Sequence, residues 1–454
     1  MLALLVLATL AQVPVPIPPR EPDSSVLPEQ TLEPSPGAGD SQEPVPPLPV
    51  ASLPPATHEL FERIKRRVAQ VRIIERRSGT KSSIGSAFFV SAEGHAITNY
   101  HVVSDLVFHP EDYTAELVRD GQQAVPVRLI DVDVVHDLAV VRFEQRMADF
   151  FALEERPPPQ GTRLFAMGNP RDLGTTIVEG TYNGLVQDAL YDRVHFSGAI
   201  NPGMSGGPTL TGEGRVVGVN VATMGNQVGF LVPVEHARAL LTRARERLAE
   251  GPSQEALFDS VRTQIFEHQQ RVTDHLMATP LPPQTLGAYQ VPGRWLPFLK
   301  CWGDTPHDAE RPYSVTNYQC SSEEDLFLTS AHRTGVVSYV HQYVSSTKLS
   351  ILRFATLYEE IFSSDPMLVE ATRDDVTNFR CRSEFVDSGG LTLRAALCLR
   401  AYKKFPGIYD LVLRAAALPS GTQGVDTSLT LAGFSPENAQ RLARRYLEGM
   451  SWMR

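Results

Sequence analysis

A serine set among glycines is the residue of this chain best suited to nucleophilic chemistry. Ser205 lies in the run Gly203-Met204-Ser205-Gly206-Gly207-Pro208. A serine hydroxyl is a weak nucleophile unless a base accepts its proton and hydrogen-bond donors stabilise the developing oxyanion. Neighbouring glycines supply backbone access and unusual dihedral angles. The run alone is only moderately specific, because glycine-rich turns with a serine are common.

Two further residues change the interpretation of Ser205. His101 ends an apolar run, and Asp137 leads directly into the apolar run Leu138–Val141. Alone, such a histidine is most often a structural hydrogen-bonding residue and such an aspartate a cap or turn residue. Together they follow the chain order His, Asp, Ser, each at the edge of a β-patterned run. That order belongs to the chymotrypsin-type double barrel, one of three unrelated orders that build a catalytic triad.

Other chemistries fit less well. The nucleophile elbow of α/β-hydrolases needs a helix directly after the serine, with the acid and histidine following it. Here Pro208 and a β-patterned run from Arg215 to Val221 follow, and His101 would be unexplained. The pair His58-Glu59 lacks the second histidine of a zinc HExxH motif. We therefore expect no metal and no cofactor.

The elements that must position these residues are mainly strands. Short β-patterned runs bounded by Gly, Asn, Asp and Pro recur between Val71 and Val232, and a helix follows from Val234 to about Ala249. This predicts an antiparallel barrel architecture. A helix over Gln254–Leu276, strand-like runs from Gly293 onward and a helix beginning at Ser435 predict a separate α+β C-terminal domain. The expected fold class is therefore mainly β, a double β-barrel followed by that second domain.

Five blocks of sequence carry a family resemblance. Read in order, these blocks are Gly85–Val90, Ala96–Val103, Asp137–Val141, Met167–Pro170 and Ala199–Pro208. Over roughly Val71 to Leu241 the chain resembles a trypsin-like serine peptidase of the bacterial HtrA/Deg type. The resemblance implies that Ser205 is the nucleophile, His101 the general base and then acid, and Asp137 the group that orients the imidazole. It also implies an oxyanion hole formed by the backbone N–H groups of Gly203 and Ser205.

The resemblance also points to a specificity pocket. Ala199, six residues before the serine, corresponds to the pocket base, and Val219, Asn220 and Val221 correspond to its wall. These residues are uncharged, so we expect cleavage after small or medium aliphatic residues in unfolded or extended protein segments. Met204 stands where many relatives have asparagine, which removes no catalytic group.

Composition and the N-terminal region suggest an exported protein. The formal net charge of -10 argues against sequence-independent nucleic-acid binding. Residues 1–11 resemble the apolar region of a secretory signal, although no Lys or Arg precedes it. A loose apolar N-terminus of a cytoplasmic protein is the alternative. Residues 12–56 are predicted to be a Pro-rich linker, since 14 prolines fall between Pro14 and Pro55. No stretch is long and apolar enough for a membrane span.

All four cysteines, Cys301, Cys320, Cys381 and Cys398, lie in the last third of the chain. Three pairings are possible. We favour Cys381–Cys398, which flank the turn-like Asp387–Gly390, together with Cys301–Cys320; four free thiols are the alternative. Disulfides fit an extracytoplasmic location. The C-terminal domain departs from the family pattern, and we do not predict a PDZ domain in it.

The predicted organisation is a signal-like segment at 1–11, a linker at 12–56, a trypsin-like peptidase domain at 57–251, a helical connector at 252–284 and an α+β domain at 285–454. The leading hypothesis is an exported, periplasmic or secreted, serine endopeptidase acting on proteins or peptides, whose C-terminal domain recruits substrate or a partner. Two alternatives remain open. The protease fold acts as a catalytically silent binding or scaffold module, or it is an enzyme gated by the C-terminal domain.

Overall fold

The computed structural model describes residues 57–119, 122–223, 228–247, 251–306, 308, 310–322, 326–329, 332–364 and 371–453. By its contacts the chain divides into residues 1–53 and residues 54–454, and all described residues lie in the second unit. The predicted signal-like segment and Pro-rich linker fall outside the described residues. None of the described helices is long and apolar enough to cross a membrane.

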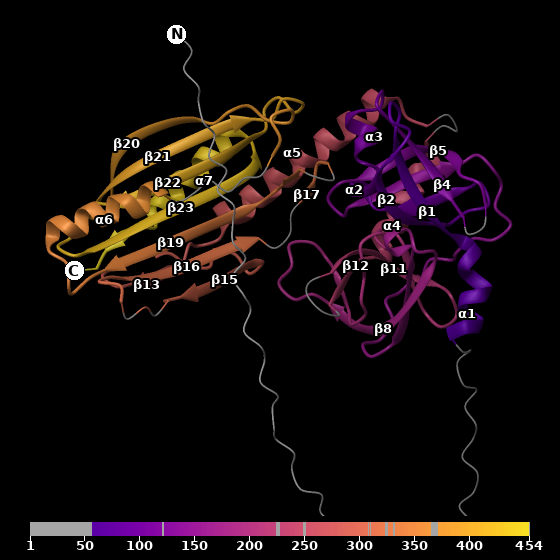
Figure 1. The fold of residues 1–454 in the computed structure, drawn as a ribbon, viewed down its shortest axis with the longest axis horizontal. Coiled ribbons are helices and arrows are strands. Elements are labelled where there is room, and N and C mark those ends of the chain that lie inside the picture. Colours follow the sequence, from indigo (N-terminus) through magenta and orange to yellow (C-terminus); the bar gives the residue numbers. More distant parts are fainter. Residues whose placement is uncertain are drawn as a thin grey trace, which may run out of the picture. The chain divides into compact units, whose positions relative to one another are not determined.

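The first of two closed barrels contains six antiparallel strands (Figure 1, indigo to purple). In barrel order they are β1 (Val68–Glu75), β2 (Lys81–Phe89), β3 (His95–Thr98), β6 (Leu138–Phe143), β5 (Val125–Asp133) and β4 (Tyr113–Val118). The β2–β3 turn requires glycine, because Gly94 has φ +87° and a Cβ there would lie 2.2 Å from the carbonyl oxygen of Phe143. Two one-turn helices, α2 (Tyr100–Val103) and α3 (Asp105–Phe108), follow β3.

The second barrel also closes with six strands (Figure 1, magenta). In barrel order they are β10 (Pro208–Leu210), β11 (Val216–Thr223), β12 (Gly229–Pro233), β9 (Val194–Phe196), β8 (Thr176–Leu185) and β7 (Arg163–Gly168). Helices α1 (Thr57–Ile64) and α4 (Val234–Glu246) bury apolar residues, Leu60 and Leu240 among them, in one core with both barrels. A 3-10 turn, η1 (Lys65–Arg67), joins α1 to β1, and another, η2 (Pro170–Asp172), follows β7. The prediction of a mainly β double barrel is confirmed.

The C-terminal region is α+β, as the sequence predicts. Its main sheet has seven strands in the order β15 (Leu299–Asp304), β16 (Ser314–Ser322), β19 (Val337–Ser345), β23 (Gln423–Phe434), β22 (Tyr409–Ala417), β21 (Leu391–Ala401) and β20 (Arg380–Ser388). Three short strands, β13 (Pro283–Leu286), β14 (Tyr289–Pro292) and β24 (Ser451–Trp452), form a second sheet. Helices α6 (Ile351–Ser364) and α7 (Pro436–Glu448) complete the region, and Ser435 caps α7 by accepting a hydrogen bond from the backbone N–H of Asn438.

Helix α5 (Gln254–Ala278) belongs to two cores at once. Its first half buries Val261 and Ile265 in the cluster that fills the first barrel. Its second half buries Val272 and Leu276 against the main sheet of the C-terminal region. The apolar periodicity of this segment therefore serves two different partners along one helix.

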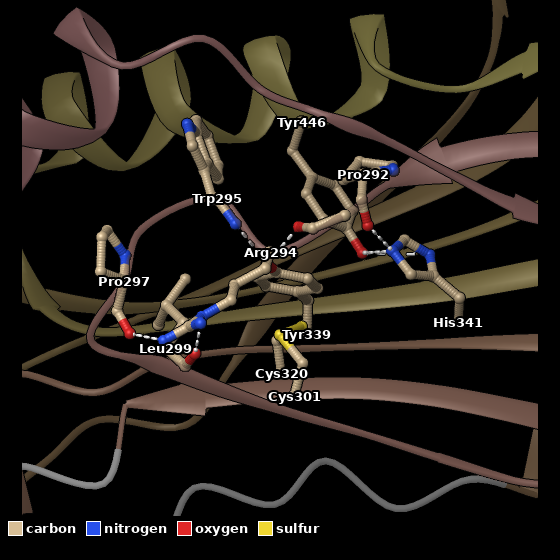
Figure 2. Close-up of a disulfide and its surroundings, with 11 residues drawn as sticks. Pro292, Arg294, Trp295, Pro297, Leu299, Cys301, Cys320, Tyr339, His341 and Tyr446 are labelled. Atoms are coloured by element: carbon tan, nitrogen blue, oxygen red, sulfur yellow. Dashed lines mark hydrogen bonds between the residues drawn. A yellow bond between two sulfur atoms is a disulfide. The ribbon is translucent and has the colours of Figure 1, made fainter. Parts of the chain in front are cut away.

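Both disulfides favoured from the sequence are present. Cys301 pairs with Cys320 across β15 and β16, and Cys381 pairs with Cys398 across β20 and β21. Figure 2 shows the Cys301–Cys320 bridge beneath Trp295 and Tyr339. The Tyr339 hydroxyl donates to the carbonyl of Gly293 at 2.6 Å and accepts from the backbone N–H of Trp295 at 3.1 Å, so this buried hydroxyl beside the bridge has both a donor and an acceptor partner.

A small hairpin extends from the C-terminal region to the first barrel. It pairs β17 (Leu326–Phe327) with β18 (Arg333–Thr334). Leu326 and Leu328 are buried in the same cluster as Tyr100 and Val102 of the first barrel. The C-terminal region therefore shares a hydrophobic core with the barrel that carries His101.

Candidate active site

His101 and Asp137 form a hydrogen-bonded pair on the first barrel. His101 lies in α2, directly after β3, and Asp137 lies in the turn before β6. The His101 backbone N–H donates to Asp137 Oδ1 at 2.8 Å, and His101 Nδ1 is 2.7 Å from Oδ2. The side chain of Asp137 is 5% exposed and that of His101 is 19% exposed. The buried carboxylate of Asp137 is thus hydrogen-bonded to both the backbone and the ring of His101.

The backbone around Asp137 reinforces this pair. Asp137 has φ 57°, a left-handed conformation that aspartate tolerates better than most residues. Its carbonyl accepts from the side-chain amide of Asn99 at 2.7 Å and from the backbone N–H of Tyr100 at 3.2 Å. The short contact between Nδ1 and Oδ2 suits a proton on Nδ1 of His101, and in the neutral ring that tautomer leaves Nε2 with a lone pair. That is the tautomer a general base requires.

Ser205 lies in the turn that leads into β10 of the second barrel. Its Oγ donates to the carbonyl of Val221 at 3.0 Å. Within the described ranges, no hydrogen bond joins Ser205 Oγ to His101. The glycine that follows the serine explains how the loop approaches the first barrel. Gly206 has φ +82°, and a Cβ there would lie 2.3 Å from the carbonyl oxygen of Ser86 and 2.8 Å from the backbone nitrogen of Asn99.

Ser86, on β2, links the loop of residues 203–207 to the first barrel; this loop is called the nucleophile loop after the role predicted for Ser205. Its backbone N–H donates to the carbonyl of Ser205 at 2.8 Å, and its Oγ donates to the carbonyl of Gly203 at 2.7 Å. The same Oγ accepts from the backbone N–H of Asn169 at 2.9 Å. Ser86 is fully buried, so these bonds are shielded from water. The sequence placed Ser86 in a family block but offered no signal for this role.

Gly203 occupies a conformation that only glycine adopts readily. Its φ is +94°, and a Cβ would lie 2.5 Å from the carbonyl oxygen of Asn169. Among the hydrogen bonds of the described residues, none has the backbone N–H of Gly203 or of Ser205 as donor. Two neighbouring donors without a protein acceptor are suited to binding an oxyanion.

The residues predicted to line a specificity pocket have different surroundings. Ala199 is half-buried. Val219 and Asn220 are fully buried, and the Asn220 amide donates to the carbonyls of Met167 at 2.9 Å and Met204 at 3.2 Å. Asn220 therefore holds the nucleophile loop through the carbonyl of Met204, and Val219 packs in the barrel core. The side chains of these two residues are thus buried, and their assignment to a pocket wall stays a prediction. Val221 is half-buried and contributes the carbonyl that accepts from Ser205.

An aromatic residue of the C-terminal region lies against His101. The ring of Phe327, on β17, has its centroid 4.7 Å from that of the imidazole, at an interplanar angle of 34°. The guanidinium of Arg333, on β18, lies 4.6 Å from the centroid of the Phe327 ring. Sequence reasoning predicted only strand-like runs from Gly293 onward and missed this contact.

One cluster in the described part of the chain groups potential metal ligands: His109, Glu111 and Asp112, whose ligand atoms lie within 4.8 Å of one another. The ammonium of Lys404 lies 3.3 Å from His109 Nε2. A cation at this distance opposes binding of a metal ion. The cluster is therefore a poor fit for a metal.

Comparison with known proteins agrees with this geometry. Residues 85–219 match the family model of the trypsin-like peptidase domain. Probable periplasmic serine endoproteases described as DegP-like, from Bartonella henselae and Chlamydia muridarum, are 33% and 31% identical to this chain. The two matches cover 36% and 35% of this chain, and 34% and 33% of the relatives. The serine protease PepD of Mycobacterium tuberculosis is 28% identical over 48% of this chain and 53% of its own.

A solved serine endoprotease from Yersinia pestis aligns with 43% of this chain and 69% of its own, at 23% identity and a TM-score of 0.38. The chain thus spans about a third of the length of the first DegP-like relatives. Within the matched segment, the resemblance to trypsin-like serine peptidases of the HtrA type is confirmed.

Proposed function

We propose that this protein is a serine endopeptidase that hydrolyses peptide bonds through Ser205, His101 and Asp137. The observation that carries the proposal is the His101–Asp137 pair, with distances of 2.7 and 2.8 Å, together with a glycine-rich serine loop that Ser86 ties to the same barrel. The match of residues 85–219 to the trypsin-like peptidase domain supports it independently.

The proposed reaction begins with a rotation of the Ser205 side chain from the carbonyl of Val221 toward His101 Nε2. Nε2 then takes the hydroxyl proton while Oγ attacks the scissile carbonyl carbon. The backbone N–H groups of Gly203 and Ser205 stabilise the resulting oxyanion. His101 next donates its proton to the leaving amine, the C–N bond breaks, and an acyl-enzyme remains. Water, deprotonated by His101, hydrolyses the ester and restores Ser205.

Asp137 acts throughout by holding the imidazole. Its two carboxylate oxygens accept from the ring and from the backbone N–H of the same residue, so the ring neither rotates nor changes tautomer when Nε2 becomes charged. Asp137 also stabilises the imidazolium that forms transiently. It gains no proton itself.

The proposed substrates are unfolded or extended proteins and peptides, cleaved after small or aliphatic residues. Ala199 adds no charge at the proposed pocket base, and the nearby Val221 is likewise uncharged. The relatives named as periplasmic endoproteases, together with two disulfides, support an extracytoplasmic location. We assign this activity to residues 57–251, with 252–284 as a helical connector and 285–454 as a domain that recruits substrate or a partner.

The test uses the full chain and its Ser205→Ala variant. Labelling by a fluorophosphonate and hydrolysis of an unfolded protein are measured side by side. We expect both signals in the wild type and neither in the variant. Hydrolysis that persists in Ser205→Ala, or a wild type that shows neither signal, would refute the proposal.

A further inference from the structure

The segment Leu326–Leu328 anchors the hairpin of β17 and β18 to the first barrel. Leu326 and Leu328 are 4% and 2% exposed, and they lie in the core cluster of the first barrel. Phe327, between them, is half-buried, packs against the same cluster and contacts the ring of His101. All three side chains therefore hold the hairpin on the barrel, and the ring of Phe327 also lies against the imidazole.

The attachment to the first barrel involves the neighbour of His101. The Tyr100 hydroxyl donates to the carbonyl of Leu328 at 3.1 Å. Tyr100 is fully buried, and burial, followed by the nearby negative charge of Asp137, raises the pKa of its hydroxyl well above the usual value. The hydroxyl therefore stays protonated and remains a donor. A hydrogen bond thus joins Tyr100, the residue before His101, to Leu328, the residue after Phe327.

The other end of the hairpin is fixed to the main sheet. Thr334 Oγ1 is 2.9 Å from the hydroxyl of Tyr402, which donates to Asp410 at 2.6 Å. Asp410 in turn pairs with Arg400 at 2.7 Å, and both are buried. Detaching the hairpin would expose Leu326 and Leu328 to solvent and break the hydrogen bonds of Leu328 and Thr334. These contacts therefore hold Phe327 in its position against His101.

Any peptide substrate must pass close to Phe327. The scissile carbonyl has to lie within reach of both Ser205 Oγ and His101 Nε2, so a side chain next to the scissile bond lies against the imidazole. The Phe327 ring is 4.7 Å from that imidazole by centroids, and the His101 side chain keeps 19% of its surface exposed. The Phe327 ring therefore borders the exposed part of the imidazole.

We infer that Phe327 is a specificity-determining residue, which forms the apolar wall of the substrate subsite beside His101 and favours an apolar side chain adjacent to the cleaved residue. The inference rests on the proposed peptidase function. Arg333, stacked on Phe327 at 4.6 Å, supports the orientation of the ring. The active site is therefore composite: the barrels supply the reacting groups, and the C-terminal region supplies part of the substrate wall.

The test compares cleavage profiles of full-length variants. A peptide library varies the residues on both sides of the cleaved bond, and kcat/KM is measured for the wild type, Phe327→Ala, Phe327→Leu and the control Phe385→Ala. Phe385 is 67% exposed on β20, so Phe385→Ala removes the same kind of ring at another position of the C-terminal region. In Phe327→Ala we expect the preference for apolar side chains over glycine to fall about tenfold or more at one position. Phe327→Leu should keep most of it, and Phe385→Ala should match the wild type.

Three results would overturn the inference. An equal rise in kcat/KM for every peptide would mean that Phe327 obstructs the site. An equal fall for every peptide would mean that it supports only His101 or the fold. An unchanged profile would mean that substrate does not touch it. Fluorophosphonate labelling of Ser205 separates these results from failure of the proposed function: a wild type that neither labels nor hydrolyses refutes the function, and the inference with it.

Discussion

Replacing Ser86 with alanine should loosen the nucleophile loop without touching any reacting group. Ser86 Oγ bridges the two barrels, since it donates to Gly203 at 2.7 Å and accepts from Asn169 at 2.9 Å. The variant leaves a buried carbonyl and a half-buried N–H without this partner. The carbonyl belongs to Gly203, whose own N–H is a proposed oxyanion donor. A structural change and a catalytic change are therefore both expected.

The size of each effect can be worked from these bonds. A buried polar group left without its partner costs roughly 1–3 kcal/mol. Because the Gly203 carbonyl is buried while the Asn169 N–H is only half-buried and partly reaches water, the free energy of unfolding of Ser86→Ala should fall by about 2–4 kcal/mol. Misplacement of one oxyanion donor costs up to about 10²–10³ in rate, and each 1.4 kcal/mol lost in the transition state is about tenfold. We expect the rate of Ser205 labelling and kcat/KM to fall about ten- to hundredfold.

The assay combines denaturant unfolding with fluorophosphonate labelling of folded protein. Ser314→Ala is the matched control, because Ser314 is exposed and its hydroxyl contacts only the Ser345 hydroxyl, at 3.0 Å, among its described side-chain partners. It should behave like the wild type in both measurements. If Ser86→Ala is destabilised but labels at the wild-type rate, the link between Ser86 and the oxyanion donors is refuted. If its stability is unchanged, the hydrogen-bond argument itself fails.

Three further predictions follow from the same structure. Asp137→Asn should keep the fold but lower kcat by up to about 10⁴, the magnitude known for this change in a Ser-His-Asp triad, because the amide favours the wrong His101 tautomer; a smaller than tenfold loss in steady-state kinetics would contradict the assigned role. Burial lowers the pKa of His268 to about 4 and of His341 to about 3, from 6.5. As the pH falls, the histidines of the unfolded chain therefore take up protons before those of the folded chain. The free energy of unfolding should drop from about pH 6.5 downward, by roughly 2 kcal/mol per histidine at about pH 5. Denaturant unfolding curves that coincide above about pH 6.5 and at about pH 5 would exclude this. Reduction of Cys301–Cys320, which closes a separation of 19 residues beside the Trp295 core (Figure 2), should lower the free energy of unfolding by about 2–5 kcal/mol; the Cys301→Ser/Cys320→Ser double variant should show the same loss in denaturant unfolding, and an unchanged midpoint would argue against it.

Features that depend on neighbours in the chain were predictable from sequence. The glycines around Ser205 indicate a tight turn, because positive φ is tolerated chiefly by glycine, and Gly203 and Gly206 do have φ of +94° and +82°. The Cys381–Cys398 bridge joins adjacent strands of a hairpin at a separation of 17 residues, so the intervening turn indicates it. The start of α7 is indicated by two adjacent residues, Ser435 as the N-cap and Pro436 at the first helical position.

Features that depend on barrel closure and domain packing were not predictable. Asn220 belongs to a predicted pocket wall, but its side chain is buried and its amide donates to the carbonyl of Met204, beside Ser205. Ser86 reaches Gly203 across 117 residues, and its bonds exist only because two barrels close against each other. No periodicity or spacing in the sequence predicts a hydrogen bond between residues so far apart in the chain.

The sequence by itself therefore predicted the candidate reacting groups and determined the kind of fold that carries them, since side-chain chemistry, turn conformations and hydrophobic alternation are local properties. Only the tertiary structure decided what surrounds those groups. Phe327 lies more than two hundred residues after His101 in the chain, yet its ring packs on the imidazole. That contact results from burial of Leu326 and Leu328 in the core of the first barrel, a long-range packing choice that the local pattern of residues 326–334 does not specify.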